Sequence, residues 1–183
     1  MQRTRQNPAE PPPALLAVAN AVPSVLWSVL ALVPISVYCY QYLAQPWLYG
    51  FLALSLLAYA VPTAWFGHWQ LSSRPARYRR LGVALVNRVT QHGDFINRLI
   101  RRRYPAYRHV RSRAAVAALV RTTYHQERFH LMGFLFFLFT SGYAAARGQA
   151  GWCGLLLLTN VGYNVYPVWL QQYLRVRLAP KAP

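Results

Sequence analysis

The stretch of sequence that decides the fold is VPSVLWSVLALVPISVYCYQYLAQPWLYGFLALSLLAYAVPTAWF, residues 22–66. It lies within a run of 63 residues, from Pro11 to Ser73, that contains no Asp, Glu, Lys or Arg. A membrane-spanning helix takes about 20 apolar residues to cross a hydrocarbon core about 30 Å thick, so this run has room for two spans. We predict spans over residues 22–43 and 47–66, joined by a tight polar connection.

Two further apolar stretches follow later in the chain. Residues 129–146 contain FLFFLF, and residues 152–173 contain LLLL. Aromatic side chains near the ends of the proposed spans are typical of the headgroup level of a bilayer. The sequence therefore predicts an all-α polytopic membrane protein with four transmembrane helices. We expect one membrane domain over residues 14–178, flanked by a disordered, Pro-rich tail at residues 1–13 and a C-terminal tail at residues 179–183.

Charge is segregated along the chain. The sequence carries 20 Lys and Arg against 3 Asp and Glu, a formal net charge of +17, and 14 of the basic residues, all Arg, lie between residues 74 and 128. This pattern excludes an ordinary soluble enzyme. Because basic residues flanking spans stay on the cytoplasmic side, we expect a multi-pass membrane protein with both termini in the cytoplasm.

The basic loop at residues 70–128 is too long to be a simple connector. Leu and Val recur at helical spacing between its arginines, which predicts amphipathic helices in the interface of an anionic membrane. Membrane lipids are therefore the expected partners of most of these arginines, and binding of cofactor phosphates is the alternative for some. A nucleic-acid interface would instead need aromatic stacking platforms, so we expect no nucleic-acid partner.

Two ionisable residues mark the start of the third apolar stretch. Glu127 and His130 are three residues apart, so they share one face of a helix. A carboxylate beside an imidazole fixes its tautomer and raises its basicity, which suits deprotonation of a hydroxyl group. The alternative is that Glu127 pairs with Arg128 or another arginine of the basic loop, and that His130 is an interfacial aromatic. The spacing lacks the third ligand of a zinc site, so we predict no metal.

A polar stripe runs along the fourth apolar stretch. Its members recur at intervals of four, three, four and four residues: Asn160, Asn164, Pro167, Gln171 and Arg175. Polar side chains within a span avoid lipid, so the stripe faces either the other helices or a polar ligand. A proline within the stripe removes a backbone donor and frees a carbonyl.

Together these residues resemble a known family. Glu127-x-x-His130, Asn164-Val-Tyr-Pro167, Gln171-Gln-Tyr173-Leu-Arg175-Val-Arg177 and His92-Gly-Asp-Phe-Ile-Asn97 are similar to segments of the glycosyl-4,4'-diaponeurosporenoate acyltransferases, small bacterial membrane proteins of the staphyloxanthin type of carotenoid pathway. The resemblance covers about residues 90–178. It implies transfer of a fatty acyl chain to a sugar hydroxyl of a glycosylated carotenoid or similar glycolipid.

The resemblance also implies roles for single residues. His130 would be the general base and Glu127 its orienting partner, while Asn164 and Gln171 would hold the sugar or polarise the acyl carbonyl. If the donor is acyl-CoA, basic side chains would bind its phosphates. The remaining expected substrate contacts, in addition to those two amides, are Asn160, Tyr173, Arg175, Arg177, His92 and Asn97. We expect no bound cofactor, and direct transfer without an acyl-enzyme, because no Ser or Cys lies in an obvious nucleophile setting.

A second hypothesis comes from another class of protein. The chain would be a non-catalytic membrane subunit that binds a lipid or carotenoid, or that anchors a larger complex through its Arg-rich face. The polar stripe would then supply hydrogen bonds between helices. The sequence leaves open an oligomer or a protein partner under either hypothesis.

Overall fold

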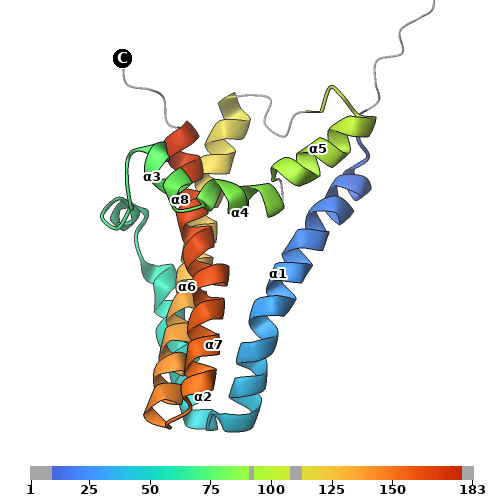
Figure 1. Ribbon diagram of the computed structural model, residues 1–183. Helices are drawn as coiled ribbons and strands as arrows, with labels where there is room; N and C mark the ends of the chain where they lie inside the picture. Colours follow the sequence, from blue (N-terminus) through green and yellow to red (C-terminus); the bar gives the residue numbers. More distant parts are fainter. Residues whose placement is uncertain (1–9, 91–92, 108–112, 179–183) are drawn as a thin grey trace, which may run out of the picture.

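The computed structural model describes residues 10–90, 93–107 and 113–178, and every regular element in these segments is helical. Two long helices dominate the molecule, α1 (Pro13–Tyr42) and α6 (Arg113–Ala146). Figure 1 shows them running between the same two ends of the molecule. The predicted all-α fold is therefore confirmed.

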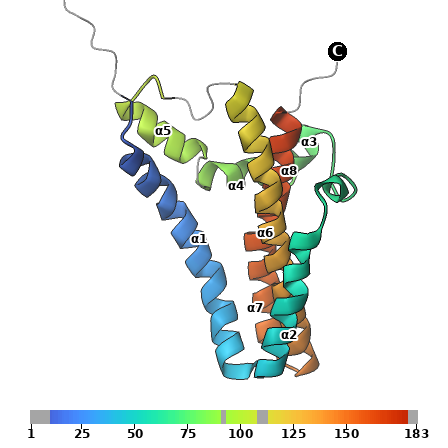
Figure 2. The same cartoon turned by 180° about the vertical axis from the view of Figure 1, so that it is seen from behind.

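Helix α6 is the centre of the bundle. It packs against α2 (Gln45–Leu56), α7 (Ala150–Asn160) and α8 (Tyr166–Leu178). Helix α1 packs on α7 near the end where α1 turns into α2, and it diverges from the bundle toward the other end (Figure 2). A core of side chains, among them Tyr38 and Phe137, joins α1, α6 and α7 near the turns.

The number of membrane spans differs from the prediction. Within the described residues, two helices are long and apolar enough to cross a bilayer, namely Pro13–Tyr42 and Val116–Ala146, the second being most of α6. This fits a membrane protein. The prediction of four such helices is wrong, although α1 covers the expected span 22–43 up to Tyr42, beginning nine residues earlier, and α6 contains the expected span 129–146.

The expected span 47–66 is interrupted. Helix α2 has 12 residues, a rise of about 18 Å, and gives way to two short 3-10 helices, η1 (Leu57–Ala60) and η2 (Thr63–Gly67). Val61 between them is extended and precedes Pro62, as expected because the proline ring disfavours a helical residue before it. The segment still carries the chain toward the opposite end of the bundle (Figure 1).

The expected span 152–173 is divided by a wide turn. Helix α7 passes into a π-helical segment, η3 (Val161–Val165), and then into α8. All three have helical backbones, but neither α-helix reaches the length of a span by itself. Wide turns of this kind are frequent at functional sites, and this one lies against α6.

In its described part, the basic loop contains three short helices, of which the periodicity predicted the second and third. These are α3 (Pro75–Arg80), α4 (Val83–Val89) and α5 (Asp94–Arg103). A left-handed glycine, Gly82 with φ 77°, makes the turn between α3 and α4. The three helices gather at the end of the molecule where α1 begins and α8 ends (Figure 1). Residues 1–9 of the expected N-terminal tail and the C-terminal tail at 179–183 lie outside the described residues.

Candidate functional site

Polar side chains of α6 meet those of the α7–η3–α8 segment in two layers. We call the layer nearer the basic end the Glu127 layer, formed by Thr123, Glu127, Gln172, Arg175 and Tyr78. We call the other the His130 layer, formed by His130, Gly133, Asn160 and Asn164. Glu127 and His130 are one turn apart on α6, so the two layers are adjacent.

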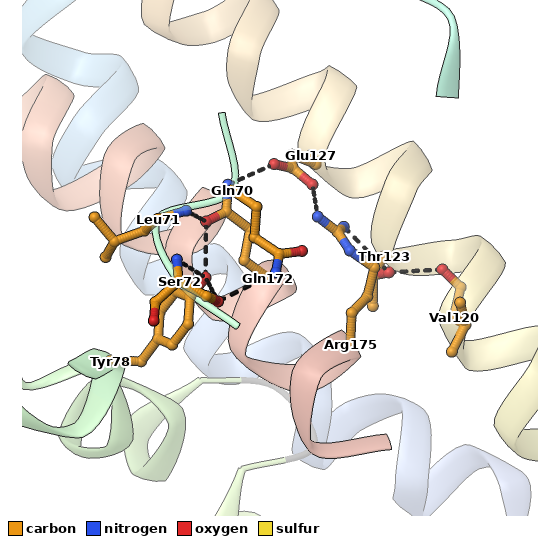
Figure 3. A network of polar contacts seen from close by, with 9 residues as sticks. All are labelled: Gln70, Leu71, Ser72, Tyr78, Val120, Thr123, Glu127, Gln172 and Arg175. Carbon is orange, nitrogen blue, oxygen red and sulfur yellow. Dashed lines mark hydrogen bonds and ion pairs between the residues drawn. The ribbon is translucent and has the colours of Figure 1, made fainter. Parts of the chain in front are cut away.

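The centre of the Glu127 layer is a buried ion pair between Glu127 and Arg175 (Figure 3). The Glu127 side chain is only 1% exposed, and its other oxygen accepts a hydrogen bond of 2.9 Å from the Gln172 amide. The Arg175 guanidinium also donates to the Thr123 hydroxyl at 3.4 Å and lies 4.2 Å from the centre of the Tyr124 ring. Charge, hydrogen bonds and an aromatic face thus compensate the removal of both ions from water.

Helix α3 completes this layer from the loop side. The buried Tyr78 hydroxyl lies 3.2 Å from Gln172 Oε1, which also accepts a hydrogen bond of 3.1 Å from the Leu71 backbone N–H (Figure 3). The same hydroxyl exchanges hydrogen bonds with the backbone of Ser72. Burial raises the pKa of the Tyr78 hydroxyl above its ordinary value, so it stays a neutral donor. Gln172 therefore links α8, α6 and the segment that leads into α3.

The His130 layer contains a chain of amides with a fixed direction. Asn160 Nδ2 donates to the Phe134 carbonyl of α6 at 3.1 Å, which leaves Asn160 Oδ1 as an acceptor. Asn164 Nδ2 donates to that oxygen at 2.9 Å. Asn164 Oδ1 is consequently the last atom of the chain, and this buried acceptor receives no hydrogen bond of ordinary geometry within the described structure, although the His130 ring lies beside it.

A glycine allows the close approach of η3 to α6. A Cβ atom at Gly133 would lie 2.5 Å from Asn164 Oδ1, closer than real Cβ atoms approach any neighbour. Any larger residue would therefore displace the Asn164 side chain. Gly133 lies one turn beyond His130 on α6, so the glycine brings the amide chain to the level of the imidazole.

His130 lies beside the end of this chain. Its ring is adjacent to the Asn164 side chain and the backbone of Tyr163, and it packs edge-to-face on the Tyr163 ring at 5.8 Å. Its Nδ1 is buried and makes no hydrogen bond of ordinary geometry to the described residues. Pro167 has no N–H to offer the carbonyl of Tyr163 four residues earlier. The layer therefore holds an imidazole nitrogen and an amide oxygen close to each other, neither of which makes a hydrogen bond of ordinary geometry within the described residues.

The structure brings most of the predicted residues together, in a different pairing from that expected. Glu127 binds Arg175 and Gln172, and no hydrogen bond joins it to His130 in the described structure. The alternative pairing with Arg128 or another loop arginine also differs from the structure, because Arg175 lies on α8 and Arg128 donates to Val61 and Thr63. Gln171 is half-buried, whereas its neighbour Gln172 is the buried amide.

The other predicted residues lie at the edges of this region or away from it. Tyr173 is buried against Tyr78, with ring centres 6.1 Å apart. Arg177 is exposed and stacks on the Tyr173 ring at 5.4 Å. Asn97 lies on α5, which packs on α4 and α1 rather than on α6. His92 lies outside the described residues.

Sequence reasoning missed four residues of the two layers, Thr123, Gln172, Tyr78 and Gly133. Gln172 and Tyr78 meet only because the segment after η2 folds over α8, a tertiary contact that helix periodicity does not predict. Gly133 could have been predicted from the sequence, because an isolated glycine inside an apolar helix is typical of close packing with another helix.

The fold and these layers define a class, a small helical bundle of the membrane type with buried polar groups between its central helices. The chain belongs to the glycosyl-4,4'-diaponeurosporenoate acyltransferase family, whose family model matches residues 62–181. The match includes α6, η3 and α8 and therefore both layers. The resemblance predicted from the motifs is thus confirmed, and the family's name describes an acyltransferase of a carotenoid glycoside. No curated protein and no solved structure showed significant similarity to the chain.

Proposed function

We propose that this protein transfers a fatty acyl chain to a sugar hydroxyl of a glycosylated carotenoid or similar glycolipid, in the cytoplasmic leaflet of the bacterial inner membrane. Family membership supports the reaction class. The observation that carries the site is the His130 layer, where a buried imidazole nitrogen and a buried amide oxygen lie close together without a hydrogen bond of ordinary geometry. Buried polar groups without partners are rare in proteins and are expected where a ligand supplies the missing contact.

The membrane placement follows from the two long apolar helices. About 20 residues of α6, counted back from Ala146, span the hydrocarbon core, which places Glu127 near its boundary. The arginine-rich helices lie at the same end of the molecule as this boundary (Figure 1). Because basic segments stay in the cytoplasm, this end faces the cytoplasm and both ends of the chain lie there. An acceptor with an apolar tail and a polar head would meet His130 just below the headgroups.

In the proposed reaction His130 acts as the general base. The imidazole takes the proton of the sugar hydroxyl as its oxygen attacks the carbonyl carbon of the acyl thioester. The C–S bond then breaks, and the protonated imidazole returns the proton to the departing thiolate. No acyl-enzyme is formed. Positioned bases of this kind typically contribute about 10²- to 10⁴-fold to a rate.

The direction of the amide chain assigns a role to Asn164. The atom of Asn164 without a well-formed hydrogen bond is an oxygen, which accepts a hydrogen bond and would not stabilise an oxyanion. A sugar hydroxyl is a donor and fits this oxygen. Asn164 therefore holds the acceptor sugar beside His130, and Asn160 holds Asn164 through the bond to Phe134.

Orientation of the imidazole falls to the backbone of Tyr163 rather than to Glu127. The ring lies beside that backbone, and Pro167 leaves its carbonyl without the donor of an ordinary helix. The guanidinium of Arg175 is already engaged by Glu127 and Thr123. If acyl-CoA is the donor, the exposed Arg177 is better placed to bind its phosphates, since guanidinium forks suit phosphate.

The test is acyl transfer in membranes from cells that make the glycosylated precursor. His130→Gln removes the base and keeps a polar side chain, and we expect the rate to fall about 10²- to 10⁴-fold. The matched control is His125→Gln, an exposed histidine on the same helix, which should change the rate by less than about twofold.

Two results would contradict the proposal. Near-full transfer by His130→Gln would exclude His130 as the base. A wild-type protein that copurifies with pigment or with a stoichiometric partner, but never turns over added acyl-CoA, would favour the non-catalytic subunit. Lipid extracts analysed by mass spectrometry distinguish these results, because they report both the bound pigment and the acylated product.

A further inference from the structure

Helices α4 and α5 carry more apolar surface than the protein covers. In α5, Ile96 and Ile100 are buried, whereas Phe95 is 63% exposed and Leu99 50% exposed. In α4, Leu85 is 60% exposed and Val89 50% exposed. Each exposed pair has the i, i+4 spacing that places both side chains on one helix face.

Exposed arginines surround these apolar pairs. Between residues 74 and 107 the chain has a single acidic residue, Asp94. The arginines of this region are all exposed: Arg74, Arg77, Arg79, Arg80, Arg88, Arg98, Arg101, Arg102 and Arg103. An apolar face flanked by guanidinium groups matches the boundary between acyl chains and anionic headgroups. An acidic protein surface would satisfy the arginines but not the exposed apolar pairs.

The length of α1 places α5 at this boundary. Helix α1 has 30 residues, a rise of about 45 Å, whereas the hydrocarbon core is about 30 Å thick. Counted from Tyr42, the first nine or so residues of α1 extend beyond the core. Leu16 and Ala19 in that part pack against Ile96 and Ile100 of α5. Helix α5 therefore lies at the level of the headgroups.

We propose that α4 and α5 form an interfacial arm that embeds its exposed apolar pairs in the cytoplasmic leaflet and binds anionic lipid headgroups through its arginines. The arm joins the two parts of the bundle that diverge, since α4 packs on α8 and α5 packs on α1. A contact of 3.4 Å between Trp27 Nε1 and the Val89 carbonyl adds a link to α1. This inference rests on the membrane placement in the proposed function and not on the chemistry of His130.

The first test measures immersion of the arm in the full-length protein. A nitroxide is attached to Phe95→Cys or Leu85→Cys, in a background with Cys39→Ala and Cys153→Ala, and the protein is reconstituted in nanodiscs of phosphatidylcholine and phosphatidylglycerol. We expect both labels to collide more with oxygen than with a water-soluble nickel complex. The control is Arg101→Cys, exposed on the same helix as Phe95, where the nickel complex should prevail. Equal access of the nickel complex to Phe95→Cys and Arg101→Cys would overturn the proposal.

The second test concerns the headgroups. Native mass spectrometry counts the phosphatidylglycerol molecules that the protein retains when detergent is increased. Each of the changes Arg98→Gln, Arg101→Gln and Arg102→Gln should weaken retention about fivefold, equivalent to about 1 kcal/mol for each arginine. Unchanged retention in the triple variant would overturn the role of the arginines, as would cross-linking of the arm to an acidic protein with both labels exposed to water.

These tests separate the arm from the active site. If the two tests contradict the interfacial arm, the expected loss of activity in His130→Gln is unaffected. Conversely, if His130→Gln retains full transfer while the nitroxides are immersed, the arm stands and the catalytic assignment fails.

Discussion

The two polar layers of α6 are adjacent, but their polar groups differ in how fully they are hydrogen-bonded within the protein. In the Glu127 layer the carboxylate, the guanidinium and the Gln172 amide all have partners within the protein. In the His130 layer an imidazole nitrogen and an amide oxygen make no hydrogen bond of ordinary geometry among the described residues. A complete network fixes helices in place, whereas an incomplete one is expected to bind something else. The comparison separates a structural role from a chemical one within a single turn of helix.

The largest effect should come from removing one ion of the buried pair. Glu127→Gln leaves the Arg175 charge buried without its counterion, which typically costs about 3–5 kcal/mol. Thermal unfolding in mild detergent measures this loss. Activity per folded molecule should remain within a few-fold of wild type, because Glu127 makes no hydrogen bond to His130 in the described structure.

The control for this prediction is the double variant Glu127→Leu/Arg175→Met. Replacing both ions with apolar groups should restore much of the lost stability, since no unpaired charge stays buried. If Glu127→Gln abolished transfer at unchanged stability, the carboxylate would act in catalysis and the comparison would fail.

A smaller effect should follow from adding a side chain at Gly133, where α6 approaches the Asn164 side chain closely. A methyl group at Gly133 would lie 2.5 Å from Asn164 Oδ1, so Gly133→Ala must displace that side chain. Overpacking of this kind costs about 1–3 kcal/mol, and we expect acyl transfer to fall at least tenfold because the amide chain is displaced. Transfer assays and thermal unfolding of the same samples measure both quantities.

Helix α6 supplies a matched control, Gly142→Ala. A methyl group there meets open space, and alanine is the better helix former by about 1 kcal/mol. Stability should rise slightly and activity should not change. Equal behaviour of the two alanine variants would show that the Asn164 contact is unimportant.

The smallest effect should come from the edge of the Glu127 layer. Tyr78→Phe removes one hydroxyl that bonds to Gln172 and Ser72, worth about 0.5–1.5 kcal/mol. We expect a small fall in the unfolding temperature and unchanged turnover. Tyr59→Phe, which alters a half-exposed ring, should leave both quantities unchanged. A loss of turnover in Tyr78→Phe would extend the chemical region beyond the His130 layer.

Local signals in the sequence predicted the helices well and the spans less well. Apolar runs located α1 and α6, and periodicity between arginines located α4 and α5. The count of spans was wrong because hydropathy does not register the break at Pro62 or the wide turn at Val161–Val165. Both are changes of backbone conformation within a continuous apolar sequence.

The sequence predicted which residues form the site better than it predicted the partners of those residues. The stripe placed Asn160, Asn164 and Arg175 on a face toward α6, where they are found buried. The choice of Gln171 over Gln172 could not be corrected from the sequence, because the burial of Gln172 depends on a segment a hundred residues away. The direction of the amide chain likewise depends on a backbone carbonyl of another helix.

The direction of the hydrogen bonds in the amide chain has a consequence for turnover. The amide chain that starts at the Phe134 carbonyl ends in an amide oxygen, so in the proposed reaction it would bind the acceptor alcohol through its hydroxyl proton. Once that alcohol had become an ester, the proton would be gone and Asn164 would lose its hydrogen bond to the product. The ester would then diffuse back into the lipid while another alcohol took its place.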